Sequence, residues 1–325
     1  MDFEIKEETI ASFHDYYAEE GFALNWPHVF VLPDWIRSWW EAFGHEHRLC
    51  LYSIWDQGEI VGLAPLMAGD KEARLIGSSD VCDYLDFIVR TGREKGFIEA
   101  LLPALREEGF KRLTLEAQRP DAVFFKALAA GAGFPAGIDF SRENESFELS
   151  LPGSWDDYLA GLSKKQRHEV RRKLRRLGRE TANYRYRVIE ESEAVEDFIP
   201  VFFDLLQDNP EKAGFFTPQM EKYFQNLIVS MARDGLARFG LLEIDGNNAA
   251  AVLYFDYNSR VNLYNSGFIS TYGSLSAGLL SKVLLIKYAI EQGRQVYDFL
   301  KGREVYKSRL GAAAIPVYRV DIRLS

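Results

Sequence analysis

Cysteine is scarce in this chain of 325 residues, which contains only Cys50 and Cys82. The two lie far apart and have no partners at metal or redox spacing, so neither a disulfide framework nor a zinc module is supported. No apolar run approaches the roughly 18 residues that a membrane span needs, and the acidic N-terminus lacks the apolar core of a signal peptide. We therefore expect a soluble protein of the reducing cytoplasm.

The chain also lacks low-complexity and disordered tracts. Its composition, 47% hydrophobic and 27% charged, is typical of an ordinary folded protein. Because the length exceeds the size at which one hydrophobic core stays efficient, we expect two domains of roughly 150 residues each. A linker is expected near residues 141–153, which divides the chain into domains 1–150 and 151–325.

The net charge of −9 argues against nucleic-acid binding by the chain as a whole. The charge is uneven, however, because residues 164–179 hold nine Lys or Arg and one Glu, about +8 in all. The remainder of the chain is therefore strongly acidic, at about −17. A basic strip on an acidic body is a candidate binding site for an anionic partner.

The first half predicts a helix over residues 33–43, because Pro33 and Asp34 form a helix start signal and Gly44 a stop signal. A turn that contains Gly58 joins two apolar runs into a hairpin of residues 49–55 and 60–67. The further elements expected are a strand at 84–89, a helix at 93–108, a strand at 110–116 and a short helix at 122–130.

The second half begins with the basic helix and then repeats the order of the first half. The predicted elements are a helix near 163–180, a strand at 184–189, helices near 194–206 and 218–233, a hairpin of 236–244 and 249–257, a strand at 261–268, a helix at 277–291 and a strand at 296–300. Helix, hairpin, strand, helix and strand thus occur twice, about 185 residues apart, which indicates a duplicated α/β unit. Each copy is expected to be a mixed sheet flanked by helices.

Three signals for other sites are set aside. Residues 131–136 match a loose dinucleotide fingerprint, but they follow a helix rather than a strand and include Pro135. His45, His47 and Cys50 follow a helix end without a further ligand cluster, so no metal site is predicted. Cys82 has no histidine near it in the sequence and is expected to be a small core residue.

Two blocks of the second half carry a family resemblance. One runs from Trp155 to Leu174 and includes Leu162-Ser163-Lys164-Lys165-Gln166-Arg167; the other is Tyr297-Asp298-Phe299-Leu300-Lys301-Gly302 with Val305-Tyr306-Lys307. They resemble the BioF-like or CelD-like GNAT acyltransferases, which are similar to the tandem-domain FemABX peptidyltransferases. The first half matches more loosely, through Ser79-Asp80 and Asp83-Tyr84-Leu85-Asp86. The resemblance implies tandem GNAT-like α/β domains, the first degenerate, and an acyl transfer whose acceptor stays open.

The resemblance also implies acetyl-CoA or another acyl-CoA as the donor. Its pantetheine would pair with a splayed strand at residues 261–268, and its pyrophosphate would lie at the N-terminus of the following helix, where free N–H groups and the positive helix end favour phosphate. The usual Gly-x-Gly or Gly-x-Ala signature is absent from residues 270–278, so a turn with a serine cap is the alternative. The candidate donor-binding residues are Asn265, Ser266, Gly273, Ser274, Ser276 and Gly278.

The basic helix carries an apolar stripe of Val170, Leu174 and Leu177 with which it can dock on the domain. An outer ridge of basic residues remains, in which Arg167 and Arg171 are candidate substrate contacts. The expected partner is a phosphate of CoA or tRNA or an acidic membrane surface, and a merely solvated face is the alternative.

The charged segment after the last predicted strand is the candidate active site, since a loop at the carboxyl end of a strand commonly borders a ligand crevice. Asp298 is a candidate base, and Tyr306 or Tyr264 a candidate acid. Lys301 and Lys307 would hold phosphate or a substrate carboxylate. Ordinary charged-loop chemistry is the alternative for this segment.

In the first half, Asp80, Asp83 and Asp86 lie where a donor-binding strand would lie, and their charges would repel a pyrophosphate. The first copy is therefore expected to hold an amine or sugar acceptor, with Asp83 and Tyr84 as contacts and Asp86 as a second candidate base. Turn capping by Asp80 and Asp83 explains these aspartates equally well.

The predicted reaction is direct transfer of an acyl group from acyl-CoA to an amine or hydroxyl of a small-molecule or saccharide acceptor. A carboxylate takes the acceptor proton, a backbone N–H near residues 264–266 stabilises the oxyanion, and a tyrosine protonates the thiolate. Polysaccharide or cell-envelope synthesis is the expected setting. Two alternatives stay open, namely aminoacyl transfer from tRNA of the FemABX kind and a non-catalytic scaffold of a polysaccharide-synthesis assembly.

Overall fold

The computed structural model describes residues 3–134, 137–208 and 214–324, and the chain forms two compact units. Unit 1 comprises residues 1–145 and 315–325, and unit 2 comprises residues 146–314. The sequence predicts a boundary after residue 150 and a second domain that runs to the C-terminus. In the structure, residues 146–150 already belong to unit 2 and the last eleven residues return to unit 1.

Unit 1 contains the strand order β1-β2-β3-β4-β6-β13, with β5 paired to β3. β2 and β3 form the antiparallel hairpin that the sequence predicts. The strands are β1 (Phe3–Glu7), β2 (Arg48–Asp56), β3 (Glu59–Gly69), β4 (Glu72–Leu75), β5 (Ile88–Val89), β6 (Arg112–Gln118) and β13 (Ala313–Arg323). The helices are α1 (Ile10–Ala18), α2 (Pro33–Phe43), α3 (Glu94–Glu107) and α4 (Val123–Ala129), with short 3-10 turns η1 (Glu20–Phe22), η2 (Val29–Val31) and η3 (Gly44–Glu46).

The predicted strand at residues 84–89 is wrong over most of its length, because only Ile88 and Val89 form a strand. The Phe87 N–H donates to the Asp86 carboxylate at 2.8 Å, which occupies a group that a strand ladder would need. The strand that takes the predicted place in the fold is β4, which lies between β3 and β6 and which the sequence pattern does not predict. Two of its four residues, Glu72 and Arg74, are charged, so it carries no apolar run.

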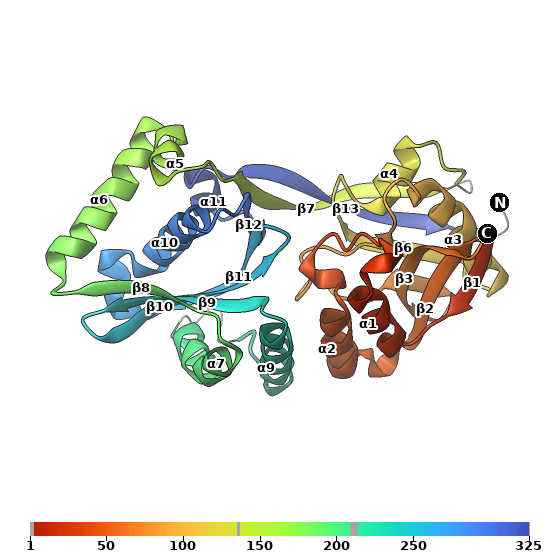
Figure 1. Ribbon diagram of the computed structural model, residues 1–325, viewed down its shortest axis with the longest axis horizontal. Helices are drawn as coiled ribbons and strands as arrows, with labels where there is room; N and C mark the ends of the chain where they lie inside the picture. Colours follow the sequence, from red (N-terminus) through yellow and green to blue (C-terminus); the bar gives the residue numbers. More distant parts are fainter. Residues whose placement is uncertain (1–2, 135–136, 209–213, 325) are drawn as a thin grey trace. The chain divides into compact units, whose positions relative to one another are not determined.

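Unit 2 contains the strand order β7-β12-β11-β10-β9-β8. Helices α10 and α6 cover one face of this sheet, and α7 and α9 cover the other (Figure 1). The strands are β7 (Ile138–Ser150), β8 (Tyr184–Ile189), β9 (Ala237–Ile244), β10 (Asn247–Tyr257), β11 (Arg260–Phe268) and β12 (Val296–Lys301). Of β7, only residues 146–150 belong to unit 2, and residues 138–145 belong to unit 1. The helices are α5 (Trp155–Gly161), α6 (Lys164–Glu180), α7 (Ser192–Gln207), α9 (Pro218–Arg233), α10 (Ala277–Glu291) and α11 (Val305–Arg309), with the 3-10 turn η4 (Ser270–Leu275).

The segment expected as a linker is instead the strand β7. Its last residues pair antiparallel with β12, so that Leu149 lies opposite Tyr297 and Glu148 opposite Asp298. Phe147 and Leu149 are buried and alternate with polar residues. The alternation is the strand signal, and the run of charged residues before it hides the signal in the sequence.

The two units share one local feature, a parallel strand pair that is only three residues long. In unit 1, β4 and β6 pair over residues 72–74 and 112–114; in unit 2, β11 and β12 pair over residues 260–262 and 296–298. In each unit the later strand then bulges through a non-glycine residue in the left-handed region, Ala117 with φ +54 and Leu300 with φ +59. The repeated order of helix, hairpin, strand, helix and strand is therefore confirmed in three dimensions.

Helix α7 packs closely on this sheet at Gly267 of β11. A Cβ at Gly267 would lie 2.6 Å from the Leu205 carbonyl group, which is backbone and cannot rotate away. We predict that Gly267→Ala lowers the free energy of unfolding by about 1–3 kcal/mol through overpacking. Urea denaturation followed by circular dichroism measures the change. Gly161→Ala is the matched control, since nothing lies within 4 Å of its Cβ, and equal stability of the two variants would contradict the packing argument.

Candidate functional site

The strands β11 and β12 separate after Asn262 and Asp298, the last residues that pair. Beyond this point β11 stays bonded to β10 as far as Phe268, whereas β12 continues beside β7. We call the opening between residues 263–268 and 299–301 the splay. It removes the β12 neighbour from the edge of β11, so that the backbone there can serve an extended ligand.

A β-bulge lies at the start of the splay. Leu253 of β10 is opposite Asn265 and Tyr254 is opposite Leu263, which leaves Tyr264 as the extra residue. Bulges re-aim side chains and are frequent at functional sites. The Tyr264 ring stacks on Phe224 of α9, with centroids 5.5 Å apart. Residues 264–266, which are predicted to provide the N–H group for the oxyanion, thus lie beside the splay.

The candidate oxyanion donors lie on this same segment. The side chains of Tyr264, Asn265 and Ser266 are all half-buried. The Ser266 N–H donates to Asn265 Oδ1 at 2.8 Å, so this amide is already engaged by a side chain.

The N-terminus of α10 follows the splay, as the sequence predicts. Its N-cap residue, Ser276, lies in the left-handed region, with φ +61. The Ser276 hydroxyl accepts a hydrogen bond from Lys173 Nζ at 2.5 Å. A lysine therefore adds its charge to the positive end of a helix, which is a favourable environment for an anion.

The other predicted residues of this turn differ in their surroundings. Gly273 and Ser274 lie exposed on η4. A Cβ at Gly278 would lie 2.7 Å from the Phe268 ring, so this glycine lets α10 pack closely on β11. The need for glycine at this position comes from packing inside the unit.

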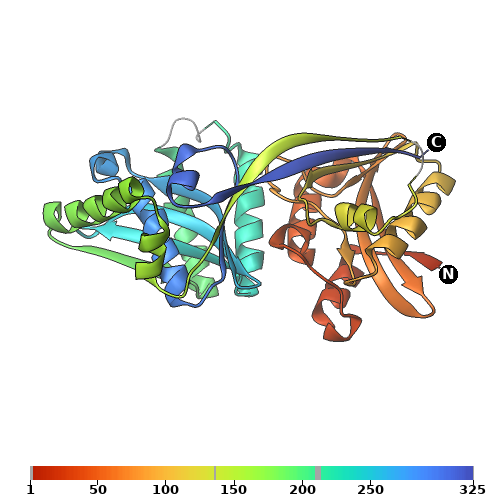
Figure 2. The same ribbon diagram turned by 90° about the horizontal axis from the view of Figure 1, so that it is seen from above.

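Lys173 is provided by α6, which begins after the N-cap Ser163. Val170 and Leu177 are buried, and Leu174 packs against the same core, which confirms the predicted apolar stripe. Both views show α6 lying beside α10 (Figures 1 and 2). Helix α6 therefore brings one basic side chain to the start of α10 while most of its charge stays outside.

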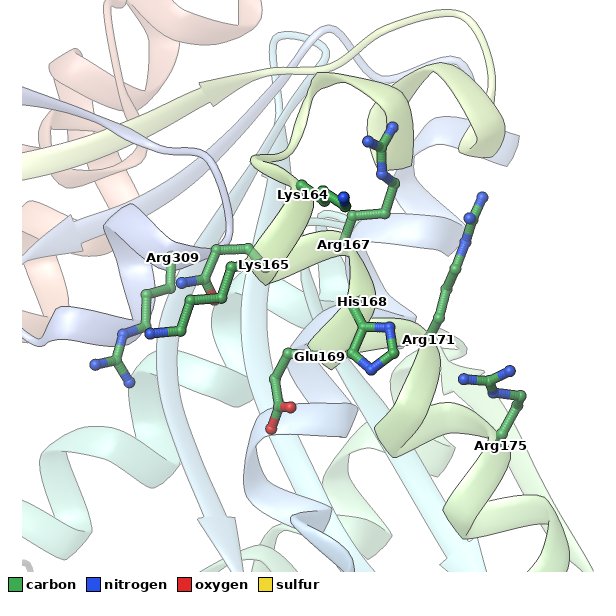
Figure 3. A pocket seen from close by; sticks show the side chains of 9 residues that line it. Lys164, Lys165, Arg167, His168, Glu169, Arg171, Arg175 and Arg309 are labelled. Carbon is green, nitrogen blue, oxygen red and sulfur yellow. The ribbon is translucent and has the colours of Figure 1, made fainter.

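The outer part of α6 borders an open hollow of about 1150 Å³ (Figure 3). The predicted contacts Arg167 and Arg171 both line it. The full lining consists of Lys164, Lys165, Gln166, Arg167, His168, Glu169, Arg171, Arg175 and, from α11, Arg309.

Asp298 is fully buried at the base of the splay. One of its oxygens accepts the Leu300 N–H at 2.8 Å, and the other lies 3.4 Å from Arg260 Nη2. Arg260 also pairs with Glu148 of β7. The carboxylate thus holds the bulge of β12 and shares an arginine with a second carboxylate.

Lys307 is buried and lies against the end of β12. Its ammonium group donates to the carbonyls of Leu300 and Lys301, at 3.2 and 2.6 Å, and lies 3.0 Å from Glu304. Lys301 and Tyr306 are half-buried nearby in sequence, and burial, more than the nearby Glu304 charge, raises the pKa of Tyr306 well above its usual range. The hydroxyl of Tyr306 therefore stays protonated and can only donate or accept hydrogen bonds.

The predicted residues of the first half lie in unit 1. Asp86 is buried, and its carboxylate accepts the N–H groups of Phe87 and of Val123, the first residue of α4. Burial raises the pKa of Asp86 to about 7, against the lowering effect of these hydrogen bonds. The buried Tyr84 ring lies 4.8 Å from the Arg119 guanidinium, and Asp83 is half-buried. Asp86 thus caps a helix, whatever further role it has.

Other chemistry finds little support in the described residues. They contain no group of three or more His, Cys, Asp or Glu side chains that could hold a metal ion. Cys82 is buried and accepts a hydrogen bond from Trp35 Nε1 at 3.3 Å, which confirms it as a core residue. None of the helices that the structure describes has the length and hydropathy of a membrane span.

Three residues of the site were missed from the sequence, namely Lys173, Arg260 and Glu148. Lys173 is one of nine basic residues in this segment, so its charge alone does not distinguish it. Its position beside the apolar stripe of α6, however, indicates a side chain close to the domain. The pairing of Arg260 with Glu148 and Asp298 joins three strands and has no local signal.

Comparison with known proteins identifies the domain type of unit 2. Residues 164–308, less than half of the chain, match the family model described as an acetyltransferase (GNAT) domain. No curated protein matches the sequence. The predicted GNAT domain in the second half is thus confirmed, and with it a fold of acyltransferases. The BioF-like or CelD-like branch of the superfamily stays a prediction.

Solved structures show that the likeness extends over both units. FemX shares 13% identity, with a TM-score of 0.67 over 98% of this chain and 97% of its own. A conserved protein of unknown function from Bacteroides thetaiotaomicron shares 11% identity, with a TM-score of 0.63 over 99% and 100%. The C-terminal domain of a putative lysylphosphatidylglycerol synthetase from Agrobacterium fabrum shares 13%, with a TM-score of 0.56 over 85% and 83%. At such identities the likeness concerns the fold alone.

The burial of Asp86 predicts a pH-dependent stability of unit 1. Because folding raises the pKa of this carboxyl from 3.8 to about 7, the protonated form favours the folded state, and that contribution is lost as the pH rises from about 4 to about 7. We predict that wild-type protein loses roughly 1 kcal/mol of unfolding free energy per pH unit in this window relative to Asp86→Asn. Urea denaturation at several pH values measures this difference. Asp83→Asn should keep the wild-type slope, and a wild-type slope in Asp86→Asn would refute the assignment.

Proposed function

We propose that unit 2 transfers an acyl group from acyl-CoA to an amine or hydroxyl of a small-molecule or saccharide acceptor. The observation that carries the proposal is the splay between β11 and β12, which leads directly to the N-terminus of α10 with Lys173 on its cap. The strand edge suits the amide-containing chain of the donor. The cationic helix end that follows it suits the pyrophosphate.

The donor is held by backbone on one side and by charge on the other. The pantetheine amides would hydrogen bond to the edge of β11 after Asn262. The pyrophosphate would accept from the first N–H groups of α10 and from Lys173, in place of the present bond to Ser276. This arrangement needs no Gly-x-Gly signature, because a side-chain cation supplies part of the attraction.

The reaction is a single displacement at the thioester carbonyl. The acceptor nitrogen or oxygen forms a bond to the carbonyl carbon, the oxyanion accepts a backbone N–H of β11 near Tyr264, and the C–S bond breaks. The acceptor gives one proton to a carboxylate base, and the departing thiolate takes one proton from solvent, so that charge and atoms balance. Tyr306, which stays protonated, is suited to donate a hydrogen bond to the departing sulfur.

Of the two carboxylates nominated as the base, Asp298 fits the proposal better than Asp86. Both carboxylates accept a backbone N–H, but Asp298 lies at the base of the splay in unit 2, whereas Asp86 caps a helix of unit 1. Lys307 donates hydrogen bonds to two carbonyls at the end of β12, so we assign it a positioning role.

Lys173 provides the test of donor binding. We predict that Lys173→Gln weakens acetyl-CoA binding roughly ten- to hundredfold, which is the usual weight of a charge-assisted hydrogen bond. Isothermal titration calorimetry with acetyl-CoA and with a longer acyl-CoA measures the effect. Arg172→Gln is the matched control, because Arg172 lies on the same helix and bonds to the same Glu169 but is exposed.

The outcome also decides between donors. If wild-type protein bound no acyl-CoA but transferred an aminoacyl group from tRNA, the CoA proposal would be wrong and the tRNA alternative correct. If neither donor bound, the scaffold alternative would replace both.

Asp298 provides the test of the chemistry. We predict that Asp298→Asn lowers kcat about a hundredfold or more, as expected for loss of a general base, without a change in the Kd of acetyl-CoA. Free thiol release in the presence of an acceptor amine measures turnover. Glu148→Gln removes the other carboxylate on Arg260 and should turn over like wild type. A loss of activity in both variants would show that the ion-pair cluster acts only through folding.

A further inference from the structure

The hollow along α6 has more cationic groups than the donor proposal uses. Among the residues that the structure describes, five of its basic side chains form no ion pair with a carboxylate: Lys164, Lys165, Arg171, Arg175 and Arg309. Within the part of the chain that the structure describes, Arg167 has one long contact of 3.5 Å to the Ala160 carbonyl and no ion pair. Unpaired cations around one hollow attract an anion more strongly than the same number of paired ones.

The one acid in the lining does not neutralise this charge. Glu169 accepts two hydrogen bonds from Arg172, at 3.0 and 2.8 Å, and lies 3.4 Å from Lys173. Hydrogen bonding from Arg172 lowers the pKa of Glu169 to about 2. Its negative charge is therefore balanced by partners outside the set of unpaired cations.

An apolar cavity adjoins the hollow. It has a volume of about 210 Å³ and lies between α6, α10 and α11. Its apolar wall is formed by Val170, Leu279, Leu280, Val283 and Leu310, and Lys173 and Tyr306, which the proposed function also uses, line the same cavity. Gln166, Glu169 and Arg309 line both the hollow and the cavity, so the two spaces meet at these residues. At about 30 Å³ per water-sized group, the cavity has room for about seven such groups.

We propose that this face of unit 2 binds an anionic membrane phospholipid, with its phosphate in the hollow and the end of one acyl chain in the adjoining cavity. The inference goes beyond the acyl transfer proposed above, because it would attach unit 2 to a lipid surface, and the lipid cavity would border the proposed donor site at Lys173 and Tyr306. A cationic space beside an apolar one suits a molecule with a phosphate at one end and hydrocarbon at the other.

A lipid surface fits these observations better than RNA does. Of the nine residues that line the hollow, only His168 has an aromatic ring on which a base could stack, and none is Phe, Tyr or Trp. A sugar-phosphate backbone also has no group for the apolar cavity. The protein as a whole carries −9, so an anionic membrane would attract it only through a local basic face such as this one.

Vesicle co-sedimentation tests the electrostatic half of the proposal. We predict that wild-type protein binds vesicles of phosphatidylcholine mixed with phosphatidic acid and not vesicles of phosphatidylcholine alone. Arg171→Glu with Arg175→Glu should reduce binding at least twentyfold, since each basic residue near an anionic surface contributes about fivefold. Both arginines are exposed, so the double variant should keep the wild-type Tm. Lys222→Glu with Arg233→Glu, both exposed on α9, makes the same charge change on another helix and should bind like wild type.

Calorimetry with soluble probes tests the cavity. Dihexanoylphosphatidic acid should bind at least tenfold tighter than glycerol 3-phosphate, because each buried methylene contributes about fourfold. Leu279→Trp, which fills the half-buried side of the cavity, should remove this difference and leave the affinity for glycerol 3-phosphate unchanged.

Three results would overturn the proposal. One is equal binding of wild type to neutral and anionic vesicles, and another is equal affinity for the two soluble probes. The third is a double variant on α6 that keeps vesicle binding but loses binding of tRNA, which would assign this face to RNA.

Discussion

The architecture of unit 2 depends on how the backbone is satisfied where β12 leaves β11. A parallel ladder that stops after three residues exposes N–H and C=O groups that must find other partners. Two charged side chains provide them: Asp298 accepts the Leu300 N–H, and Lys307 donates to the carbonyls of Leu300 and Lys301. β12 pairs with β7 on both sides of the bulge that results, while its pairing with β11 ends at Asp298.

The same constraint explains why the segment after β12 is rich in charge. In the sequence this segment reads as a cluster of candidate catalytic groups, and part of that cluster supports the backbone. Unit 1 meets the equivalent problem with other residues: the Ala117 N–H donates to Glu143 at 3.2 Å, and Gln118 Nε2 donates to the Leu85 carbonyl at 2.6 Å. Both copies thus contain a short parallel strand pair followed by a bulge, although different side chains stabilise the bulge.

Local patterns were sufficient for the elements that carry strong signals. The hairpins, α6 with its buried Val170 and Leu177, and α10 lie where the sequence predicts them. Short or polar strands such as β4 and β7 were missed, because their pairing is decided by distant segments rather than by their own periodicity. The contact of Lys173 with Ser276, 103 residues away, is likewise a product of how α6 packs on α10.

The helix that follows the first strand of each parallel pair shows how the two copies diverge. In unit 2 the start of α10 has Lys173 on its cap and no acidic residue in its first turn. In unit 1 the corresponding helix, α3, has Arg93 as its N-cap and begins with Glu94 and Lys95, so its first turn carries charges of both signs. The proposed function assigns the anionic donor to the start of α10, where Lys173 bonds to the cap. The duplicated backbone thus keeps its short parallel strand pair in both copies, while the residues at the two helix starts differ.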